Sequence, residues 1–201
     1  MSHTFKHLKD HTVKVLVFFL LALAGLSFIS GSADKGSQHA SSEPDSLYKP
    51  VKKDVLLFYI QLSENHNIIV YDINYNHDKT VDGKNPVHTY WIRYSDKGQN
   101  QELSYFQRHL VYGLESKMID SLKQTFLVHF VSYKKKSIYL VRKDKNDKYY
   151  PCTSIQGKMS VLSKIYIQVE PRTFGLPKVR HVELHGRELT TNKYLVEKII
   201  P

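Results

Sequence analysis

The sequence predicts a mainly β fold: an antiparallel sandwich or barrel of about eight strands, with one amphipathic helix inserted after the third strand. Short apolar stretches recur between clusters of turn-forming residues, which is typical of a chain that folds into many strands. Several of these stretches alternate apolar and polar side chains, as strands with one buried face do. Many of the 14 tyrosines fall within them, and tyrosine favours a pleated, half-buried surface.

The first three predicted strands come in quick succession. Residues 55–62 are almost continuously apolar, as expected of a central strand that is covered on both faces. A polar turn over 63–67 leads into a second strand over 68–75, so we expect the two to form a hairpin. The third strand spans 86–94 and begins with Pro86, at a position where a proline costs no ladder hydrogen bond.

The predicted helix follows the third strand. Leu103, Phe106, Leu110 and Leu114 recur at steps of three and four residues, which would place an apolar stripe on one helix face. Gly113 would serve as a C-terminal cap or a kink.

The rest of the chain returns to strand patterns. The remaining predicted strands span 125–133, 137–143, 149–155, 158–169, 179–184 and 193–199. The segment 158–169 shows the cleanest alternation of the chain and predicts a long strand with one solvated face.

The N-terminus has the three parts of a secretory signal peptide. A segment with three lysines precedes the apolar run Val15–Ile29, and the small residues Ser30–Ala33 follow. We therefore expect 1–33 to be a signal peptide that is cleaved after Ala33, and the protein to be periplasmic or secreted. The apolar run is close to the minimum length of a spanning helix, so retention as an uncleaved anchor is the alternative, and the only expected contact with a membrane.

The domain organisation follows from this start. Residues 34–54 are rich in Ser, Lys and Pro, and predict a flexible leader. Residues 55–201 then form a single β-rich domain.

Composition narrows the classes of function. The net charge of +10 is scattered along the chain, without a recognised nucleic-acid reader, so we expect no specific nucleic-acid partner. Cys152 is the only cysteine, which excludes an intramolecular disulfide, and burial in the fold is its expected role. No common catalytic motif or phosphate-binding glycine loop is found.

Four stretches of the sequence resemble a known family: Leu56–Asn74, Pro86–Tyr94, Glu102–Leu114 and Val196–Pro201. They are similar to the exported bacterial proteins of the domain of unknown function 4833 family, whose signature is a P-x-x-x-Y-W strand. Here Pro86, Tyr90 and Trp91 carry that signature. The resemblance implies an export signal and a single β-rich domain, and it implies no activity.

One constellation suggests a metal. On a strand, His181, Glu183 and His185 would point to the same face, and imidazole and carboxylate groups are ordinary ligands of zinc or iron. Alternate residues on a strand lie nearly 7 Å apart, so all three converge only if the strand bends or another strand contributes. The alternative is that Val182 and Leu184 face the core while the three polar side chains face water. No cofactor is expected other than this candidate divalent metal.

A second constellation suggests a ligand-binding surface over Tyr90, Trp91 and Arg93. Trp91 and Arg93 would share a face of the third strand, where they could form a cation–π shelf, or Trp91 could simply anchor the core. Tyr90 would lie on the other face with His88. Tyrosines on sheets could also stack against glycans.

Two functions therefore stand open. The first is a non-enzymatic envelope module that binds a small molecule, a glycan or an envelope protein, for which we expect a cavity lined by apolar and aromatic side chains. The second is a metal-dependent or carboxylate-based hydrolase that uses His181, Glu183 and His185.

Overall fold

The computed structural model describes residues 50, 54–63, 65–143, 148–170 and 178–201. The expected signal peptide lies outside these residues, as does all of the expected leader except residues 50 and 54. Among the described residues, no helix has both the length and the apolar composition that a membrane span requires.

The described residues contain eleven strands and two short helical turns. The strands are β1 (Leu56–Leu62), β2 (Ile68–Ile73), β3 (Val87–Arg93), β4 (Gln99–Glu102), β5 (Leu114–Asp120), β6 (Thr125–Phe130), β7 (Tyr133–Arg142), β8 (Tyr149–Ile155), β9 (Lys158–Glu170), β10 (Lys178–Glu188) and β11 (Tyr194–Ile199). The turns are η1 (Tyr94–Asp96), a 3₁₀ turn, and η2 (Gln107–Val111), a π-helical turn.

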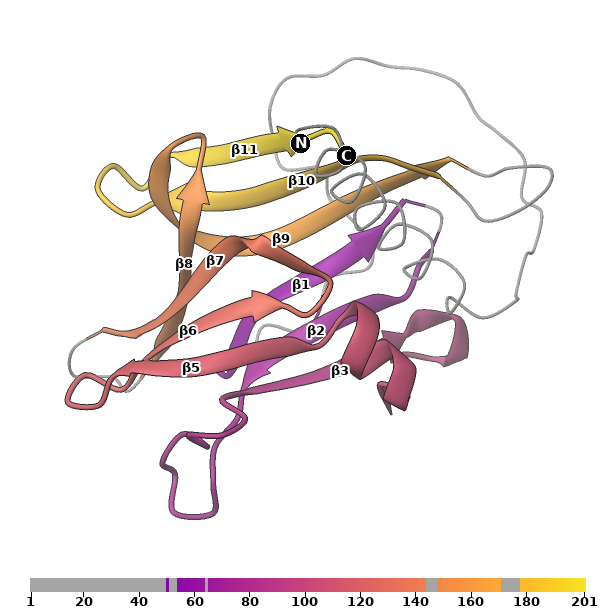
Figure 1. The fold of residues 1–201 in the computed structure, drawn as a ribbon. Coiled ribbons are helices and arrows are strands. Elements are labelled where there is room, and N and C mark those ends of the chain that lie inside the picture. Colours follow the sequence, from indigo (N-terminus) through magenta and orange to yellow (C-terminus); the bar gives the residue numbers. More distant parts are fainter. Residues whose placement is uncertain (1–49, 51–53, 64, 144–147, 171–177) are drawn as a thin grey trace, which may run out of the picture.

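All these strands belong to one sheet. Nine of them run in the order β4-β3-β2-β1-β9-β8-β7-β6-β5 and curl into an open half-barrel, while β10 pairs with β9 and β11 pairs with β10 (Figure 1). Every pairing is antiparallel except that of β1 with β9, which is parallel.

The long strand β9 causes the curl. β10 pairs with it from Ser160 to Glu170 and therefore occupies one whole edge. β8 pairs with the start of β9 up to Val161, and β1 pairs with it from Lys164 to Ile167, so these two strands share the other edge. The sheet consequently divides at β9 into two wings, β1–β4 and β5–β8, and the register of β9 with β10 shifts at the same place.

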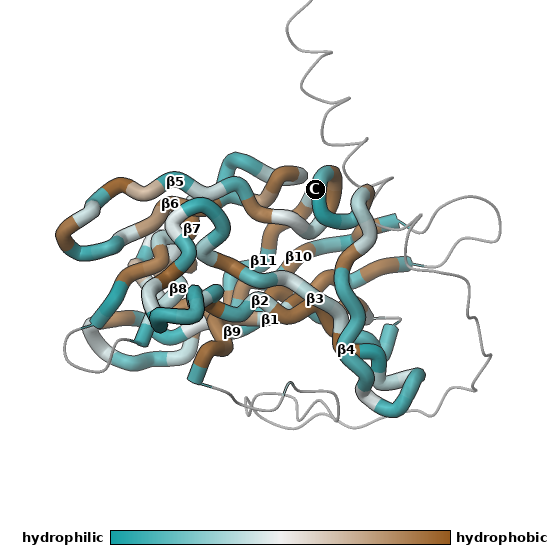
Figure 2. The backbone as a smooth tube through the Cα atoms, turned by 90° about the horizontal axis from the view of Figure 1, so that it is seen from below, coloured by the Kyte–Doolittle hydropathy of each residue, from teal (hydrophilic) through white to brown (hydrophobic). Residues whose placement is uncertain are grey.

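The core lies between the two wings. Phe58 of β1 stacks on Tyr71 of β2 with ring centroids 4.4 Å apart, and both rings meet the edge or face of Phe130 of β6. Figure 2 shows hydrophobic segments along β1, β2 and β9 near the centre, with hydrophilic loops around them. We call the side of the sheet that faces this core the inner face, and the opposite side the outer face.

The mainly β prediction is confirmed, but its details need correction. The described residues contain eleven strands instead of about eight, and the sheet is not wholly antiparallel because β1 and β9 are parallel. It is neither a two-sheet sandwich nor a closed barrel, since one sheet curls and stays open. The parallel pair joins residues about 100 positions apart, which local patterns do not reveal.

The amphipathic helix predicted after the third strand is not confirmed. Only the short helical segment 105–111 forms, ending in the π-helical turn Gln107–Val111, and Phe106 and Leu110 of the expected apolar stripe are exposed. Leu114, the last residue of that stripe, begins β5 and pairs with Phe130. The ladder of β5 with β6 thus outweighs the local helical pattern, as tertiary pairing commonly does.

Gly113 ends this turn by close backbone contact. A Cβ atom at this position would lie 1.7 Å from the carbonyl oxygen of Arg108. Only glycine allows the chain to turn from η2 into β5 so tightly.

Candidate functional site

The three residues of the expected metal constellation lie together on the outer face of β10. Glu183 bridges the two histidines: its Oε1 lies 3.1 Å from Nε2 of His181, and its Oε2 lies 3.1 Å from Nε2 of His185. On the far side of His185, Nδ1 lies 2.8 Å from the hydroxyl oxygen of Tyr194 on β11. The four side chains form one hydrogen-bonded chain.

This chain exists because the strand alternates and the carboxylate is long enough to reach both neighbours. Residues 181, 183 and 185 share the outer face, as the sequence predicts, while Leu184 packs in the core. His185 is buried, with 6% of its side chain exposed, and Glu183 is 26% exposed. A buried imidazole needs partners for both nitrogens, and Glu183 and Tyr194 supply them.

The hydrogen bonds of Glu183 to the two histidines occupy the atoms that would bind a metal. Among the described residues, no group of three or more His, Cys, Asp or Glu side chains is arranged to hold a metal ion. Nε2 of each histidine faces a carboxylate oxygen of Glu183, so a metal would have to replace these hydrogen bonds. A divalent ion here stays a prediction.

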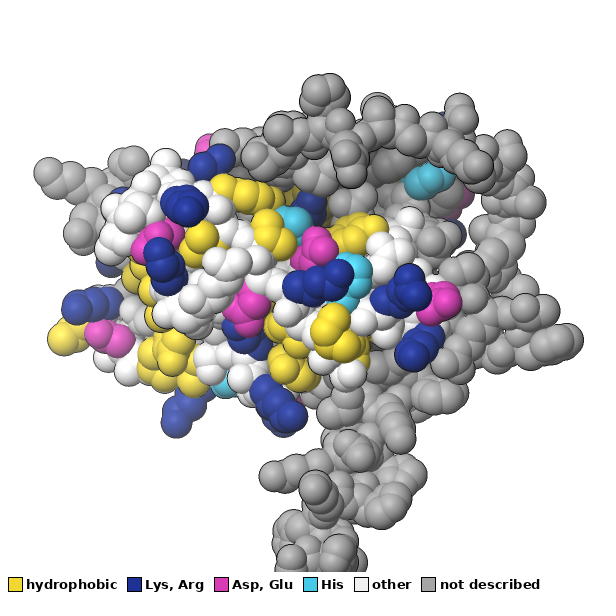
Figure 3. Space-filling view, turned by 90° about the horizontal axis from the view of Figure 1, so that it is seen from above, with side chains coloured by type: hydrophobic (Ala, Val, Ile, Leu, Met, Phe, Trp, Pro, Cys, Tyr) yellow, Lys and Arg dark blue, Asp and Glu magenta, His cyan; other side chains and the backbone are white. Residues whose placement is uncertain are grey.

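Figure 3 views the molecule from the side of β10 and β11. Histidine, acidic and basic side chains lie close together there, with apolar patches between them.

The structure does not bring the three residues of the expected ligand-binding surface to one site. Trp91 points to the inner face, is 6% exposed and packs edge-on against Tyr112 with ring centroids 5.5 Å apart. Arg93 is held at the end of β3 by Asp96, 2.9 Å from its Nε. The core role of Trp91 is therefore the one that its contacts support.

Tyr90 lies on the opposite face from Trp91. Its hydroxyl group donates a hydrogen bond to Oδ2 of Asp72 at 2.9 Å. Burial, and after it the negative charge of Asp72, holds the pKa of Tyr90 well above its usual value. This phenol therefore acts as a hydrogen-bond donor throughout the physiological pH range.

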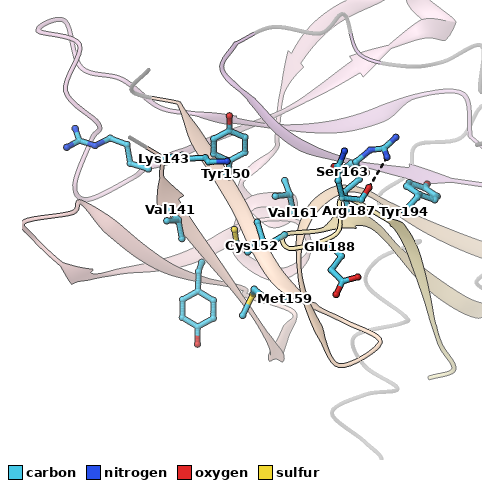
Figure 4. A pocket seen from close by; sticks show the side chains of 14 residues that line it. Val141, Lys143, Tyr150, Cys152, Met159, Val161, Ser163, Arg187, Glu188 and Tyr194 are labelled. Carbon is cyan, nitrogen blue, oxygen red and sulfur yellow. Dashed lines mark hydrogen bonds between the residues drawn. The ribbon is translucent and has the colours of Figure 1, made fainter. Parts of the chain in front are cut away.

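A groove of about 820 Å³ lies on the outer face, and Tyr194 of the hydrogen-bonded chain with His185 and Glu183 is among its lining residues (Figure 4). In Figure 4, Lys143 and Tyr150 lie at one end and Arg187 and Tyr194 at the other, with apolar side chains between them. The guanidinium carbon of Arg187 lies 5.8 Å from the centre of the Tyr194 ring, which is a cation–π contact.

Cys152 lies in the floor of this groove. It is 6% exposed, and burial raises the pKa of its thiol. A thiol in this state is a poor nucleophile, so the contacts support the packing role that the sequence suggests.

A second cavity of about 250 Å³ lies on the inner face, where the two wings separate. Its lining is mostly aliphatic and aromatic: Ile60, Val111, Tyr112, Phe130, Ile138, Leu162, Ile165, Ile167, Val179, Val182, Leu184, Ile199, Ile200 and Pro201. The remaining lining residues are Ser132, Tyr133, Lys135, Lys136 and Thr153.

Three of the polar side chains around this cavity already have partners within the protein. The hydroxyl group of Ser132 donates to the carbonyl oxygen of Val111 at 2.6 Å, and that of Thr153 donates to the carbonyl oxygen of Ser137 at 2.7 Å. Nζ of Lys136 lies 3.1 Å from Oε1 of Glu197. The surface that the cavity offers to a ligand is therefore mostly apolar, and the exposed Lys135 is the main exception.

Sequence reasoning missed the residues of this cavity. Two signals pointed toward it: the alternation over 158–169 and the apolar C-terminal residues Ile199–Pro201. Neither says that the inner side chains of β9 and β10 would leave space between them and the β6–β7 wing.

Comparison with known proteins returns one match. Residues 58–198 match the family described as Domain of unknown function (DUF4833). No curated protein and no solved structure matches the chain. Because the matched segment covers more than half of the sequence and nearly the whole sheet, the chain belongs to the DUF4833 family.

Proposed function

We propose that this protein is a non-enzymatic binding module that holds an apolar ligand, a single acyl chain, in the cavity of its half-barrel. The observation that carries the proposal is the cavity of about 250 Å³ on the inner face, with its largely apolar lining. A well-formed apolar pocket with few polar groups is the usual form of a small-molecule site.

The size of the cavity favours one chain. Ligand pockets commonly measure about 300–1,000 Å³, so this cavity lies just below that range and would not take a lipid with several chains. Each buried methylene group contributes about 0.8 kcal/mol. About six of them would contribute roughly 5 kcal/mol before the costs of ordering the ligand, which suits a carrier that binds and releases.

The polar end of the ligand would carry negative charge. Lys135 and Lys136 are the two cations among the lining residues, and Lys135 is exposed. Lys136 is already paired with Glu197, so Lys135 is the better partner for a carboxylate or a phosphate. A fatty acid is the simplest compound with both features.

The N-terminal sequence supports an extracytoplasmic setting for this role. The basic start, the apolar run Val15–Ile29 and the small residues up to Ala33 are the features of an export signal. We place the protein in the periplasm or outside the cell on this basis.

The test is displacement of a fluorescent fatty acid by unlabelled fatty acids of increasing length. Val182→Phe puts a ring into the cavity, and Val141→Phe, the matched control, puts the same ring on the outer groove. We expect V182F to weaken probe binding by about tenfold or more, since it occupies the volume of two to three methylene groups. The V141F variant should bind as the wild type does.

The outcomes separate clearly. If the wild-type protein does not bind the probe, or if V182F binds it as tightly while both variants stay folded by circular dichroism, the proposal is wrong. Loss of binding in V141F alone would place the ligand in the outer groove.

A second candidate function, hydrolysis, has one observation in its favour. The hydrogen-bonded chain from Tyr194 through His185 to Glu183 borders the outer groove, and a histidine oriented by a carboxylate is a common general base. A panel of chromogenic esters and glycosides tests it. Turnover that falls at least 100-fold in Glu183→Gln would support it, and a wild-type protein without turnover would rule it out for those substrates.

A further inference from the structure

We propose that the turn Tyr105–Leu110 is a membrane-docking tip that dips into the surface of an anionic lipid bilayer. This inference rests on the proposed function, because it supplies the place from which an acyl chain would enter the cavity. The partner of this tip is the surface of a lipid bilayer and not another protein.

The tip exposes three large apolar side chains within one turn. Tyr105 is 72% exposed, Phe106 57% and Leu110 44%. The ring of Tyr105 stacks on that of His109 at 4.1 Å and meets the ring of Phe106 edge-on at 6.0 Å. Burial of such groups is normally favourable, so a preformed exposed cluster of this kind marks a contact surface.

The tip is continuous with the wall of the cavity. Val111 and Tyr112 follow Leu110 directly, are buried and line the cavity. Their carbonyl oxygens accept hydrogen bonds from Ser132 at 2.6 Å and from Tyr71 at 2.8 Å, respectively. One side of the segment is therefore anchored in the cavity wall while the preceding residues project outward.

The size of the tip favours lipid over protein. A stable protein interface buries about 800 Å² on each partner, far more than three side chains of one turn supply. Aromatic rings with one polar edge, such as that of Tyr105, suit the headgroup level of a bilayer. The strength of reversible membrane binding grows with the apolar area that is buried and with charge attraction to anionic lipids, so a small apolar tip suits a weak, reversible contact.

The charge near the tip favours an anionic surface. Ser132, which holds Val111, is followed closely by Lys134 and Lys135, both exposed, on the first residues of β7. Lys134 pairs with Glu115, whose Oε2 lies 2.7 Å from its Nζ, so Lys135 is the lysine of the two that can meet a lipid phosphate. The chain carries a net charge of +10, of which the expected signal peptide, with three lysines and one aspartate, supplies two. Each basic residue near an anionic bilayer contributes about 1 kcal/mol.

The first experiment measures insertion at the tip. The single tryptophan, Trp91, is buried and serves as a constant background. Phe106→Trp reports on the tip, and Leu122→Trp is the matched control, because Leu122 is 92% exposed in the turn between β5 and β6. The protein is used as an exporting bacterial host yields it, with its N-terminus identified by mass spectrometry.

We expect vesicles of phosphatidylglycerol and phosphatidylcholine with brominated chains to quench F106W and to shift its emission to the blue. L122W should show neither change. This readout compares depth at two positions, so a retained N-terminal apolar segment would not produce the difference. Equal quenching at both positions, or none at position 106, would overturn the proposal.

The second experiment measures affinity. Phe106→Asp should weaken binding to these vesicles by about tenfold, because it removes one inserted ring, while Leu122→Asp should leave it unchanged. Weaker binding to vesicles of phosphatidylcholine alone is expected for the wild type. Equal affinity for both vesicles would remove the charge argument and overturn the proposal, as would a dimer that F106D dissociates.

Binding of the fatty-acid probe in solution separates this inference from the proposed function. F106D should bind the probe as the wild type does, because Phe106 does not line the cavity. If the cavity binds no probe while the tip still inserts, the proposed function fails and the docking surface stands. If the probe binds and the tip does not insert, the reverse holds.

Discussion

The two faces of one sheet differ in how they treat polar groups. On the inner face, buried hydroxyl groups bond to the backbone: that of Tyr71 donates to the carbonyl oxygen of Tyr112, and that of Thr153 to the carbonyl oxygen of Ser137. On the outer face, side chains bond to one another, as Tyr194, His185 and Glu183 do. The inner face thus stays mostly apolar, whereas the outer face of β10 and β11 gathers titratable groups.

The contrast teaches where each kind of function can reside. An apolar ligand needs a lining with few unsatisfied polar atoms, and in the inner cavity Ser132, Thr153 and Lys136 are already bonded within the protein. Acid–base chemistry needs titratable groups that contact each other and reach solvent. His181, Glu183 and His185 on the outer face satisfy this requirement. Strand alternation places both on β9 and β10 at once.

The largest expected effect comes from the centre of the inner face. Phe58→Ala removes a fully buried ring that stacks on Tyr71 and should lower the free energy of unfolding by about 3–5 kcal/mol. Phe106→Ala removes the same ring from an exposed position and should change it by less than about 0.5 kcal/mol. Urea unfolding measures both. Similar losses in the two variants would contradict the position of the core.

The next effect concerns the close packing of Gly186 in β10 against β8 and β9. A Cβ atom on Gly186 would lie 2.5 Å from the carbonyl oxygen of Val161 and 2.6 Å from Cδ1 of Ile155. Gly186→Ala should therefore cost about 1–3 kcal/mol in thermal or urea unfolding. Gly83→Ala is the matched control, since its Cβ would meet only Met118 at 3.6 Å. An unaffected G186A would mean that β9 and β10 separate more easily there than their register implies.

An effect of similar size is expected on the outer face. His185→Ala removes the buried side chain that joins Glu183 to Tyr194 and should cost about 1–3 kcal/mol. His88→Ala removes a histidine that also pairs with a carboxylate, Glu102 at 2.7 Å, but is 43% exposed, and should cost less than about 1 kcal/mol. Equal losses of unfolding free energy in the two variants would show that the hydrogen bonds of His185 stabilise the fold no more than a surface ion pair does.

The smallest expected effect is the pH dependence at Glu102. Burial raises the pKa of this carboxyl, but hydrogen bonds and charges from His88 and Arg108 outweigh it and lower the pKa below its usual value. The folded state therefore gains stability above the unfolded pKa of 4.5, and loses it as the pH falls through the lower folded value.

Glu102 is 61% exposed, so solvent screens this gain to less than about 1 kcal/mol. Glu102→Gln should slightly flatten the loss of stability below pH 5, and 1 M NaCl should shrink the difference from the wild type. A difference that grows with salt would count against the ion pairs as its cause.

Local patterns predicted much of the sheet. The runs 55–62 and 68–75 contain β1 and β2, and the alternation over 158–169 coincides with β9 to within one residue. The shared face of His181, Glu183 and His185 was also predictable, and their mutual contacts confirm it. The helix from Leu103 to Leu114 failed because its apolar spacing is equally consistent with a turn followed by a strand.

The sequence by itself determined the β class of this protein, most strand positions and the face on which each strand residue lies, because side chains alternate along any strand whatever its neighbours are. Only the tertiary structure decided which strands pair, that β1 and β8 share one edge of β9, and that a cavity stays open between the wings. Those features depend on contacts between residues far apart in the chain, which no local pattern contains.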